Sequence, residues 1–178
     1  MITIIKKVNN LRYAKIRKMD VTNGEGIAVS LFTQGCPHHC KGCWNETTWD
    51  FNGGKEWTQE LEDKMINELC AKDYVDCLSI LGGEPLCNDT LNDILRICKR
   101  FKEKYPSKKL FLWTGYTLEE VKSDDKIQVL SYVDVLIEGR YIESKRDLRL
   151  YLRGSSNQRV IDVQKTLEKG EVILWKNN

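Results

Sequence analysis

The stretch from Val75 to Pro85, Val-Asp-Cys-Leu-Ser-Ile-Leu-Gly-Gly-Glu-Pro, indicates the fold because it joins an apolar run to a glycine-rich turn. The run Val75–Leu81 is short and apolar, as expected of a buried strand. Gly82-Gly83-Glu84-Pro85 follows at its end, and Asn88 or Asp89 is placed to cap a helix after that turn. A buried strand, a tight loop and a helix in this order are typical of a βα unit.

Similar units recur on both sides of this stretch. Further strands are predicted over Ile27–Thr33, Leu110–Trp113 and Val133–Ile137, with strand-like runs at Val160–Val163 and Val172–Trp175, and helices are predicted to open at Thr58 and at a Thr117–Glu120 capping box. Repeated strand–loop–helix units predict a parallel sheet with right-handed crossovers. A full eight-unit barrel needs about 250 residues, and this chain has 178.

We therefore predict an α/β fold, a partial, open (β/α) barrel. The chain is interpreted as one domain over residues 1–178, with a core of about 20–163 and a C-terminal extension over 164–178. The open side would leave room for a large partner to dock.

Composition narrows the class of protein. Hydrophobic residues make up 41% and charged residues 30%, and 28 Lys and Arg against 26 Asp and Glu give a net charge of only +2. This balance does not favour nucleic acid or a membrane surface as a partner. The apolar run in Met1–Lys7 is too short for a signal-peptide core, and no stretch approaches the roughly 18–20 apolar residues of a membrane span. We expect a soluble cytoplasmic protein.

Seven cysteines are the unusual feature of the composition. An odd number cannot all pair, and a reducing cytoplasm leaves thiols free for metals. Three of them form a C-x3-C-x2-C loop, Cys36-Pro-His-His-Cys40-Lys-Gly-Cys43. Three thiolates this close favour one soft metal centre. An iron–sulfur cluster with three protein ligands has one open iron; the alternative is a structural zinc whose fourth ligand is His38, His39 or a distant cysteine.

Distinctive residues follow each predicted strand: the cysteine loop, Gly82-Gly83-Glu84-Pro85, Thr114-Gly115-Tyr116 and Glu138-Gly139-Arg140. In parallel α/β folds this edge of the sheet is where ligands bind. Paired glycines allow a ligand to approach the backbone closely. Their carbonyl groups and the Glu84 carboxylate would suit the ammonium group of an amino-acid ligand on an open iron.

Together these motifs resemble the radical S-adenosylmethionine superfamily. Further matches to the activating proteins of anaerobic ribonucleotide reductases are Asn23-Gly-Glu-Gly26, the Gln34–Cys40 segment, Cys43-Trp-Asn-Glu-Thr-Thr-Trp49, Trp113-Thr-Gly-Tyr116, Val135-Leu-Ile-Glu-Gly-Arg-Tyr141 and Arg153-Gly-Ser-Ser-Asn-Gln158. The similarity extends over about residues 8–163.

The resemblance implies a site and a reaction. Cys36, Cys40 and Cys43 would hold a [4Fe-4S] cluster, and S-adenosyl-L-methionine would bind its open iron. Gly42, Cys43 and Trp44 would lie along that cofactor, while Gly82, Gly83 and Glu84 would receive its ammonium group. Reductive cleavage would give a 5′-deoxyadenosyl radical, which would take a hydrogen atom from a glycine of the reductase large subunit. A flavodoxin-like protein would donate the electron, and no acid–base catalytic residue is required.

Two other functions remain open from the sequence. One is the same chemistry acting on another glycyl-radical enzyme or on a small molecule, and the other is a zinc-stabilised interaction module built on the cysteine loop. His38 and His39 are interpreted either as donors behind the cluster ligands or as solvated loop residues. Cys70, Cys77 and Cys98 are expected to be buried structural thiols, and Arg153–Gln158 is expected either to line the site or partner surface, or to form a capped turn.

Overall fold

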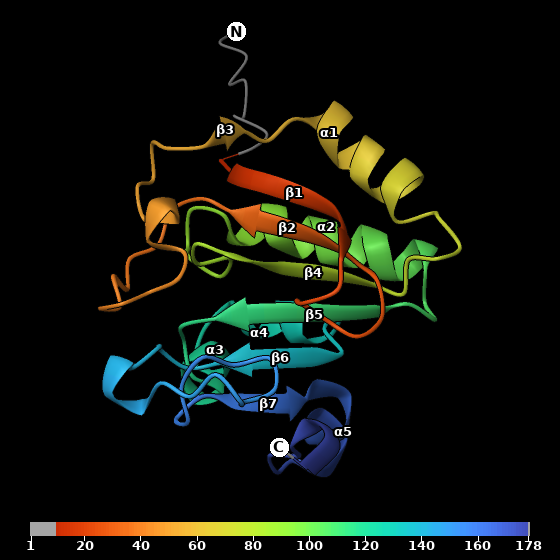
Figure 1. Ribbon diagram of the computed structural model, residues 1–178. Helices are drawn as coiled ribbons and strands as arrows, with labels where there is room; N and C mark the ends of the chain where they lie inside the picture. The colour runs from red at the N-terminus through yellow and green to blue at the C-terminus, as the bar shows by residue number, and fades with distance from the viewer. Residues whose placement is uncertain (1–9, 178) are drawn as a thin grey trace, which may run out of the picture.

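In the computed structural model, which describes residues 10–177, the chain folds around one mixed sheet (Figure 1). The Met1–Lys7 run lies outside the described residues. The described strands are β1 (Arg12–Asp20), β2 (Ala28–Thr33), β3 (Lys55–Glu56), β4 (Cys77–Gly82), β5 (Lys109–Thr114), β6 (Val135–Glu138) and β7 (Arg159–Asp162), in the spatial order β3-β1-β2-β4-β5-β6-β7. The sheet is open, with β3 and β7 at its edges.

Helices connect the central strands, as the alternating pattern predicts. They are α1 (Gln59–Lys64), which continues as a π-helical turn (Met65–Leu69), α2 (Leu91–Lys104), α3 (Leu118–Lys122), α4 (Ile127–Leu130) and α5 (Val163–Lys169), with 3-10 turns at Glu46–Thr48, Glu143–Lys145 and Trp175–Asn177. None of the helices within residues 10–177 is both long and apolar enough to cross a bilayer.

The parallel part of the sheet consists of the predicted strands. Strands β2, β4, β5 and β6 are parallel neighbours, and these are the four strands expected before helical or loop crossovers. The predicted parallel pairing holds for these four strands, and the sheet as a whole is mixed, because β1 pairs antiparallel with β2, and β7 pairs antiparallel with β6. The α/β class is confirmed, and the carboxyl ends of the four parallel strands meet at one edge.

The two faces of the sheet are packed differently. One face carries the main core against the helices, with α2 and α4 behind the sheet in Figure 1 and Phe101 of α2 fully buried. The other face holds a smaller cluster that includes Ala28, Cys77, Phe111 and Val135. Partly buried Trp113, Leu152 and Trp175 pack against this second cluster. Apolar side chains therefore cover both faces of the parallel strands, as expected for buried parallel sheets.

The capping residues predicted from the sequence are right at two helix starts and wrong at one. Thr58 Oγ1 accepts a hydrogen bond from Leu61 N, and Thr117 forms the complete capping box with Glu120. The cap predicted at Asn88 or Asp89 is wrong: α2 begins at Leu91 after Thr90, whose side chain makes no cap bond.

The prediction of a strand over Val172–Trp175 is also wrong. Within Val172–Trp175, Leu174 makes only an isolated bridge to Ile161, and a 3-10 turn begins at Trp175. The nine-residue strand β1 has no counterpart in the sequence prediction.

Candidate metal centre

The cysteine loop leaves the carboxyl end of β2 and is closed by backbone hydrogen bonds. Gly35 N donates to Thr48 O at 2.8 Å, and Cys36 N donates to Trp49 O at 3.1 Å. These bonds bring the two ends of the loop together, so the three cysteines lie within one compact loop. Inside it, Cys43 N donates to Cys40 O at 3.1 Å and forms a turn.

All three loop cysteines are free, half-buried thiols. Burial raises the pKa of the Cys36 thiol to about 11, and burial also raises the pKa of Cys40. Both are therefore protonated at neutral pH in the metal-free chain, and metal binding would have to release those protons. No three His, Cys, Asp or Glu side chains within residues 10–177 are already grouped closely enough to hold a metal ion.

The glycine motif lies directly against this loop. Thr33 at the end of β2 is in register with Gly82 at the end of β4. Gly83 N donates to Thr33 O at 3.0 Å, and Glu84 N donates to Gly35 O at 2.8 Å. A Cβ atom on Gly83 would overlap the carbonyl oxygen of Gly35. Glycine is therefore required at residue 83 for a close contact between two backbone segments, and the predicted meeting of the two motifs is confirmed.

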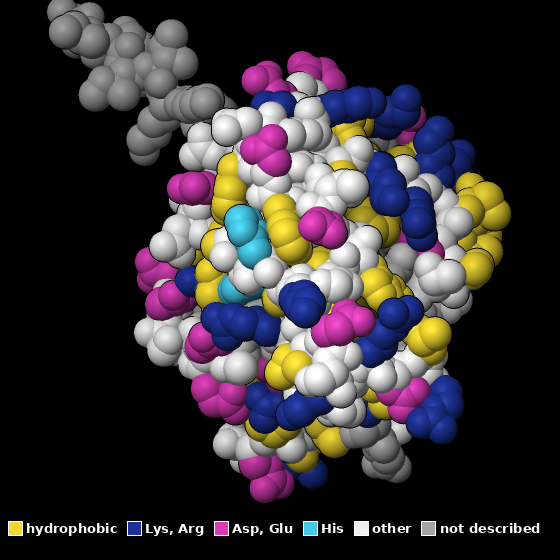
Figure 2. Space-filling view, turned by 60° about the vertical axis from the view of Figure 1, so that its left-hand side comes forward, with side chains coloured by type: hydrophobic (Ala, Val, Ile, Leu, Met, Phe, Trp, Pro, Cys, Tyr) yellow, Lys and Arg dark blue, Asp and Glu magenta, His cyan; other side chains and the backbone are white. Residues whose placement is uncertain are grey.

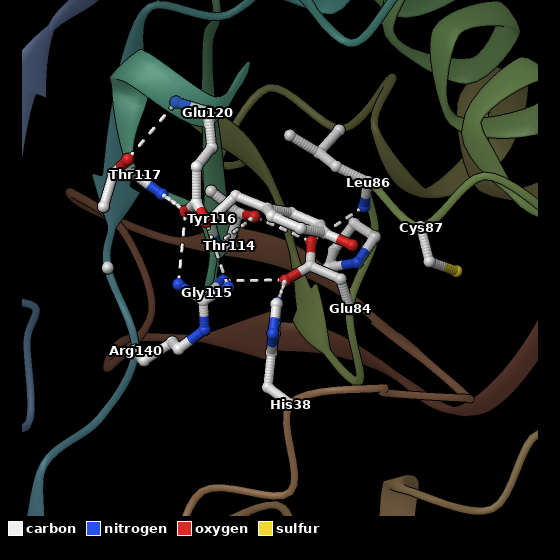
Figure 3. Close-up of polar contacts among 12 residues, drawn as sticks. His38, Glu84, Leu86, Cys87, Thr114, Gly115, Tyr116, Thr117, Glu120 and Arg140 are labelled. Atoms are coloured by element: carbon white, nitrogen blue, oxygen red, sulfur yellow. Dashed lines mark hydrogen bonds and ion pairs between the residues drawn. The ribbon is translucent and has the colours of Figure 1, made fainter. Parts of the chain in front are cut away.

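Glu84 is a buried centre of hydrogen bonds at this edge (Figure 3). Its Oε1 accepts from Thr114 Oγ1 at 2.7 Å and Leu86 N at 2.9 Å. Its Oε2 accepts from Gly115 N at 2.7 Å and His38 Nε2 at 2.9 Å. Four donors fill the roughly four lone-pair positions of a carboxylate. The carboxylate therefore links the cysteine loop to the ends of β4 and β5.

This arrangement bears on the role predicted for Glu84. The carboxylate would have to exchange one of its present donors before it accepted an ammonium group, so that role stays a prediction. The sequence also left His38 undecided between a donor and a solvated residue. Its side chain is only 6% exposed, it bonds Glu84, and its ring packs edge-on against Tyr116 with centroids 4.6 Å apart. His38 is thus a positioning donor to the Glu84 carboxylate, which ties the cysteine loop to β4.

The segment after β6 covers the other side of the loop. The Tyr141 backbone faces the Cys40 thiol and lowers its pKa, although burial has the larger effect and raises it. The flexible end of the Glu143 side chain lies against Gly42, whose φ of 75° is in the left-handed region that favours glycine. Trp44, which was predicted to lie along a cofactor, is 64% exposed, and the Arg146 guanidinium lies 5.8 Å from its ring centroid.

The remaining cysteines lie away from the loop or point into packed surroundings. Cys70, Cys77 and Cys98 are buried, as predicted, and burial raises the pKa of Cys70 to about 12. Cys87 is buried as well, and its sulfur lies 3.1 Å from Thr90 Oγ1. None of these four thiols is grouped with the loop cysteines as a ligand set.

The donor chemistry fits an iron–sulfur cluster better than zinc. The loop offers three soft thiols, which suit either metal. A structural zinc needs a fourth protein ligand, yet His38 is bonded to Glu84, and the His39 ring is stacked on Trp49 with centroids 4.8 Å apart. A cluster held by three cysteines needs no fourth protein ligand.

Comparison with known proteins agrees with this geometry. The family described as "4Fe-4S single cluster domain" matches residues 22–161. The anaerobic ribonucleoside-triphosphate reductase-activating protein of Vibrio cholerae serotype O1 is 42% identical over 151 residues, which cover 83% of this chain and 96% of that protein. The proteins of the same name from Escherichia coli K12 and Enterobacteria phage T4 are each 36% identical, over 83% and 84% of this chain and 96% and 93% of their own lengths. The chain belongs to the family of anaerobic ribonucleoside-triphosphate reductase-activating proteins.

Proposed function

We propose that this protein is a radical S-adenosylmethionine enzyme that places a glycyl radical on an anaerobic ribonucleotide reductase. The observation that carries the proposal is the direct backbone contact between the three-cysteine loop and Gly82-Gly83-Glu84 at the carboxyl edge of the parallel strands. The relatives named as reductase-activating proteins match this chain over nearly their whole length, which supports the reductase as the partner. The open sheet is proposed to be the partial barrel of that superfamily.

Cys36, Cys40 and Cys43 would hold a [4Fe-4S] cluster with one open iron. With one electron from a donor such as a flavodoxin, the cluster and S-adenosylmethionine held here would supply 5′-deoxyadenosyl-radical chemistry, with methionine and 5′-deoxyadenosine as products and the hydrogen atom coming from a reductase glycine. The backbone of Gly82 and Gly83 would approach the cofactor closely, and Gly42, Cys43 and Trp44 would flank it.

This chain's own contribution is positioning. Glu84 and His38 fix the cysteine loop relative to β4 and β5, and Tyr141 and Glu143 cover its other side. No proton transfer is needed for hydrogen-atom abstraction, so no acid–base residue is assigned. Holding the three cysteines in a fixed place matters because displacing a reacting atom by about 1 Å can slow a reaction about a hundred-fold.

Anaerobic reconstitution with iron and sulfide tests the proposal. We expect a brown protein with about four irons per chain, and reduction should produce 5′-deoxyadenosine from S-adenosylmethionine. Cys40→Ala should lose this activity, whereas Cys70→Ala, which removes a buried thiol away from the loop, should keep it. A colourless protein with a single zinc, or full cleavage by Cys40→Ala, would contradict the assignment.

A further inference from the structure

Residues 140–153, here called the basic excursion, follow β6 and carry an excess of positive charge. They contain five Arg or Lys residues and two acidic residues, although the entire chain has a net charge of only +2. Apart from the short 3-10 turn Glu143–Lys145, the segment has no helix and no strand. Leu152 near the end of the segment packs against the second core cluster, but a charged, irregular surface loop of this kind is a candidate for recognition.

The basic excursion combines charge with exposed apolar surface. Leu148 is 67% exposed, and the side chain of Arg149 beside it is 90% exposed. Ile142 and Tyr151 are each 39% exposed. Figure 2 shows this edge of the molecule, where basic and hydrophobic side chains are interspersed near the two histidines. Interspersed aliphatic, aromatic and arginine side chains are characteristic of protein interfaces.

The basic excursion also touches the cysteine loop. Glu143 packs on Gly42, Arg146 lies over the exposed ring of Trp44, and the Tyr141 backbone faces the Cys40 thiol. A protein bound on the excursion would therefore sit beside the three cysteines. That is the position a protein substrate must take if the chemistry occurs at this loop.

The base of the basic excursion is held in place by several hydrogen bonds. Asp147 N donates to Gly154 O at 3.1 Å, and Ser156 N donates to Lys145 O at 2.9 Å. Trp113 Nε1 donates to Leu152 O at 2.9 Å, although Leu152 has a φ of 58°, which is unfavourable for a side chain of this type. A surface held in one conformation loses less entropy when a partner binds.

Positive charges on the basic excursion are only partly neutralised. Its two carboxylates each face an arginine within the segment: Asp147 lies 2.8 Å from Arg149, and Glu143 lies 3.9 Å from Arg146. Arg140 is paired with Glu120 outside the segment, 3.1 Å away, so among the described residues Lys145 and Arg153 are the cations of the segment that form no ion pair. The surface is therefore complementary to a partner that is acidic and also offers apolar contacts.

We propose that the basic excursion is the docking surface for an acidic, partly apolar surface of the reductase large subunit, with Leu148 and Arg149 as its exposed contacts. This inference rests on the proposed function for the identity of the partner. The interspersed apolar residues favour a protein over nucleic acid, whose recognition relies mainly on phosphate contacts.

Affinity for the purified large subunit of the cognate reductase tests this docking surface. Sedimentation velocity under anaerobic conditions would give the Kd of wild type and of the variants Leu148→Asp and Arg149→Glu. Each should weaken binding at least about ten-fold, because one places a charge in an apolar contact and the other reverses a complementary charge. Added salt should weaken wild-type binding and affect Arg149→Glu less.

Matched controls lie at the opposite end of the strands. Tyr74→Asp changes a residue that is 50% exposed before β4, and Lys72→Glu alters the net charge by the same amount as Arg149→Glu at an exposed residue of the same segment. Both should bind within two-fold of wild type. Thermal midpoints of all variants should match, because every substituted side chain is exposed.

Reductase-free cleavage of S-adenosylmethionine separates this inference from the proposed function. Leu148→Asp and Arg149→Glu should cleave the cofactor at the wild-type rate. Unchanged Kd values in both variants, or equal losses in the controls, would overturn the docking surface even if the enzyme forms a glycyl radical. Weakened binding in a protein that never cleaves the cofactor would uphold the docking surface and overturn the proposed function.

Discussion

Replacing Glu84 by glutamine tests whether its buried carboxylate fixes the cysteine loop to the sheet. Glutamine keeps the shape of the side chain but turns one acceptor oxygen into a donor. Whichever way the amide is oriented, two of the four present donors would face an NH2 group. His38 can adapt by changing its tautomer, whereas a backbone N–H such as that of Gly115 cannot. One buried unsatisfied donor and weaker remaining bonds together cost about 2–4 kcal/mol.

Urea unfolding of the metal-free protein, kept reduced and followed by tryptophan fluorescence, measures this loss. Domains of this size have stabilities of about 5–15 kcal/mol, so Glu84→Gln should remain folded with a lower midpoint. Glu143→Gln is the matched control, because that side chain is 43% exposed and its substitution should cost less than about 0.5 kcal/mol. A Glu84→Gln protein as stable as this control would refute the reasoning.

A double-mutant cycle identifies the part of this loss that passes through His38. Because His38 Nε2 bonds Glu84 Oε2 directly, His38→Ala should cost less in the Glu84→Gln background than in wild type. We expect a coupling free energy of about 1–2 kcal/mol. Additive losses would show that His38 does not act through this carboxylate.

Three further substitutions or conditions test separate parts of the structure. Burial by itself raises the pKa of Glu62. The hydrogen bonds to this carboxylate, of which the one from Arg96 has the largest effect, outweigh burial and hold the pKa below its ordinary 4.5. Its stabilisation is therefore complete above about pH 4.5 and is lost as the pH falls through the lower folded value. Glu62→Gln should cost about 3 kcal/mol at pH 7 and progressively less in acid; a constant difference in urea unfolding would be inconsistent with this. Gly83→Ala should at least halve the iron bound after reconstitution, because its Cβ would overlap Gly35 O, and unchanged iron content would count against the close contact. Thr117→Ala should lower stability by about 1 kcal/mol through loss of the capping box, measured by thermal unfolding, and an unchanged midpoint would argue against that cap.

The sequence predicted the parallel part of the fold because its strands are continuous apolar runs that end in loop motifs. It missed β1 for a physical reason. The segment Arg12–Asp20 carries charged side chains on both sides of the strand, and most of its residues are half-buried or exposed, so the alternation that marks a strand is absent. The Val172–Trp175 run has strand-like composition, but it contributes only the Leu174 bridge to the edge strand β7.

Motif spacing was enough to bring the cysteine loop and the glycine turn to one edge, because the ends of parallel strands coincide. It did not reveal the His38–Glu84 bond, which joins residues 46 positions apart and depends on the loop conformation. The packing of Tyr141 and Glu143 against the cysteine loop could not be predicted either, because it depends on the path that the chain takes after β6. The glycine at residue 42 was the one sequence feature that pointed to a close contact on this side of the loop, because Glu143 lies against it. The division into a core of about 20–163 and an extension over 164–178 stays a prediction.

Electron paramagnetic resonance of the reductase after activation tests the central claim most directly. Reconstituted protein, reductant, S-adenosylmethionine and the purified reductase large subunit would be mixed without oxygen and frozen. The account predicts a glycyl-radical doublet on the reductase, and it predicts no such signal when Cys40→Ala replaces wild type. A wild-type sample that cleaves S-adenosylmethionine but leaves the reductase without this doublet would contradict it.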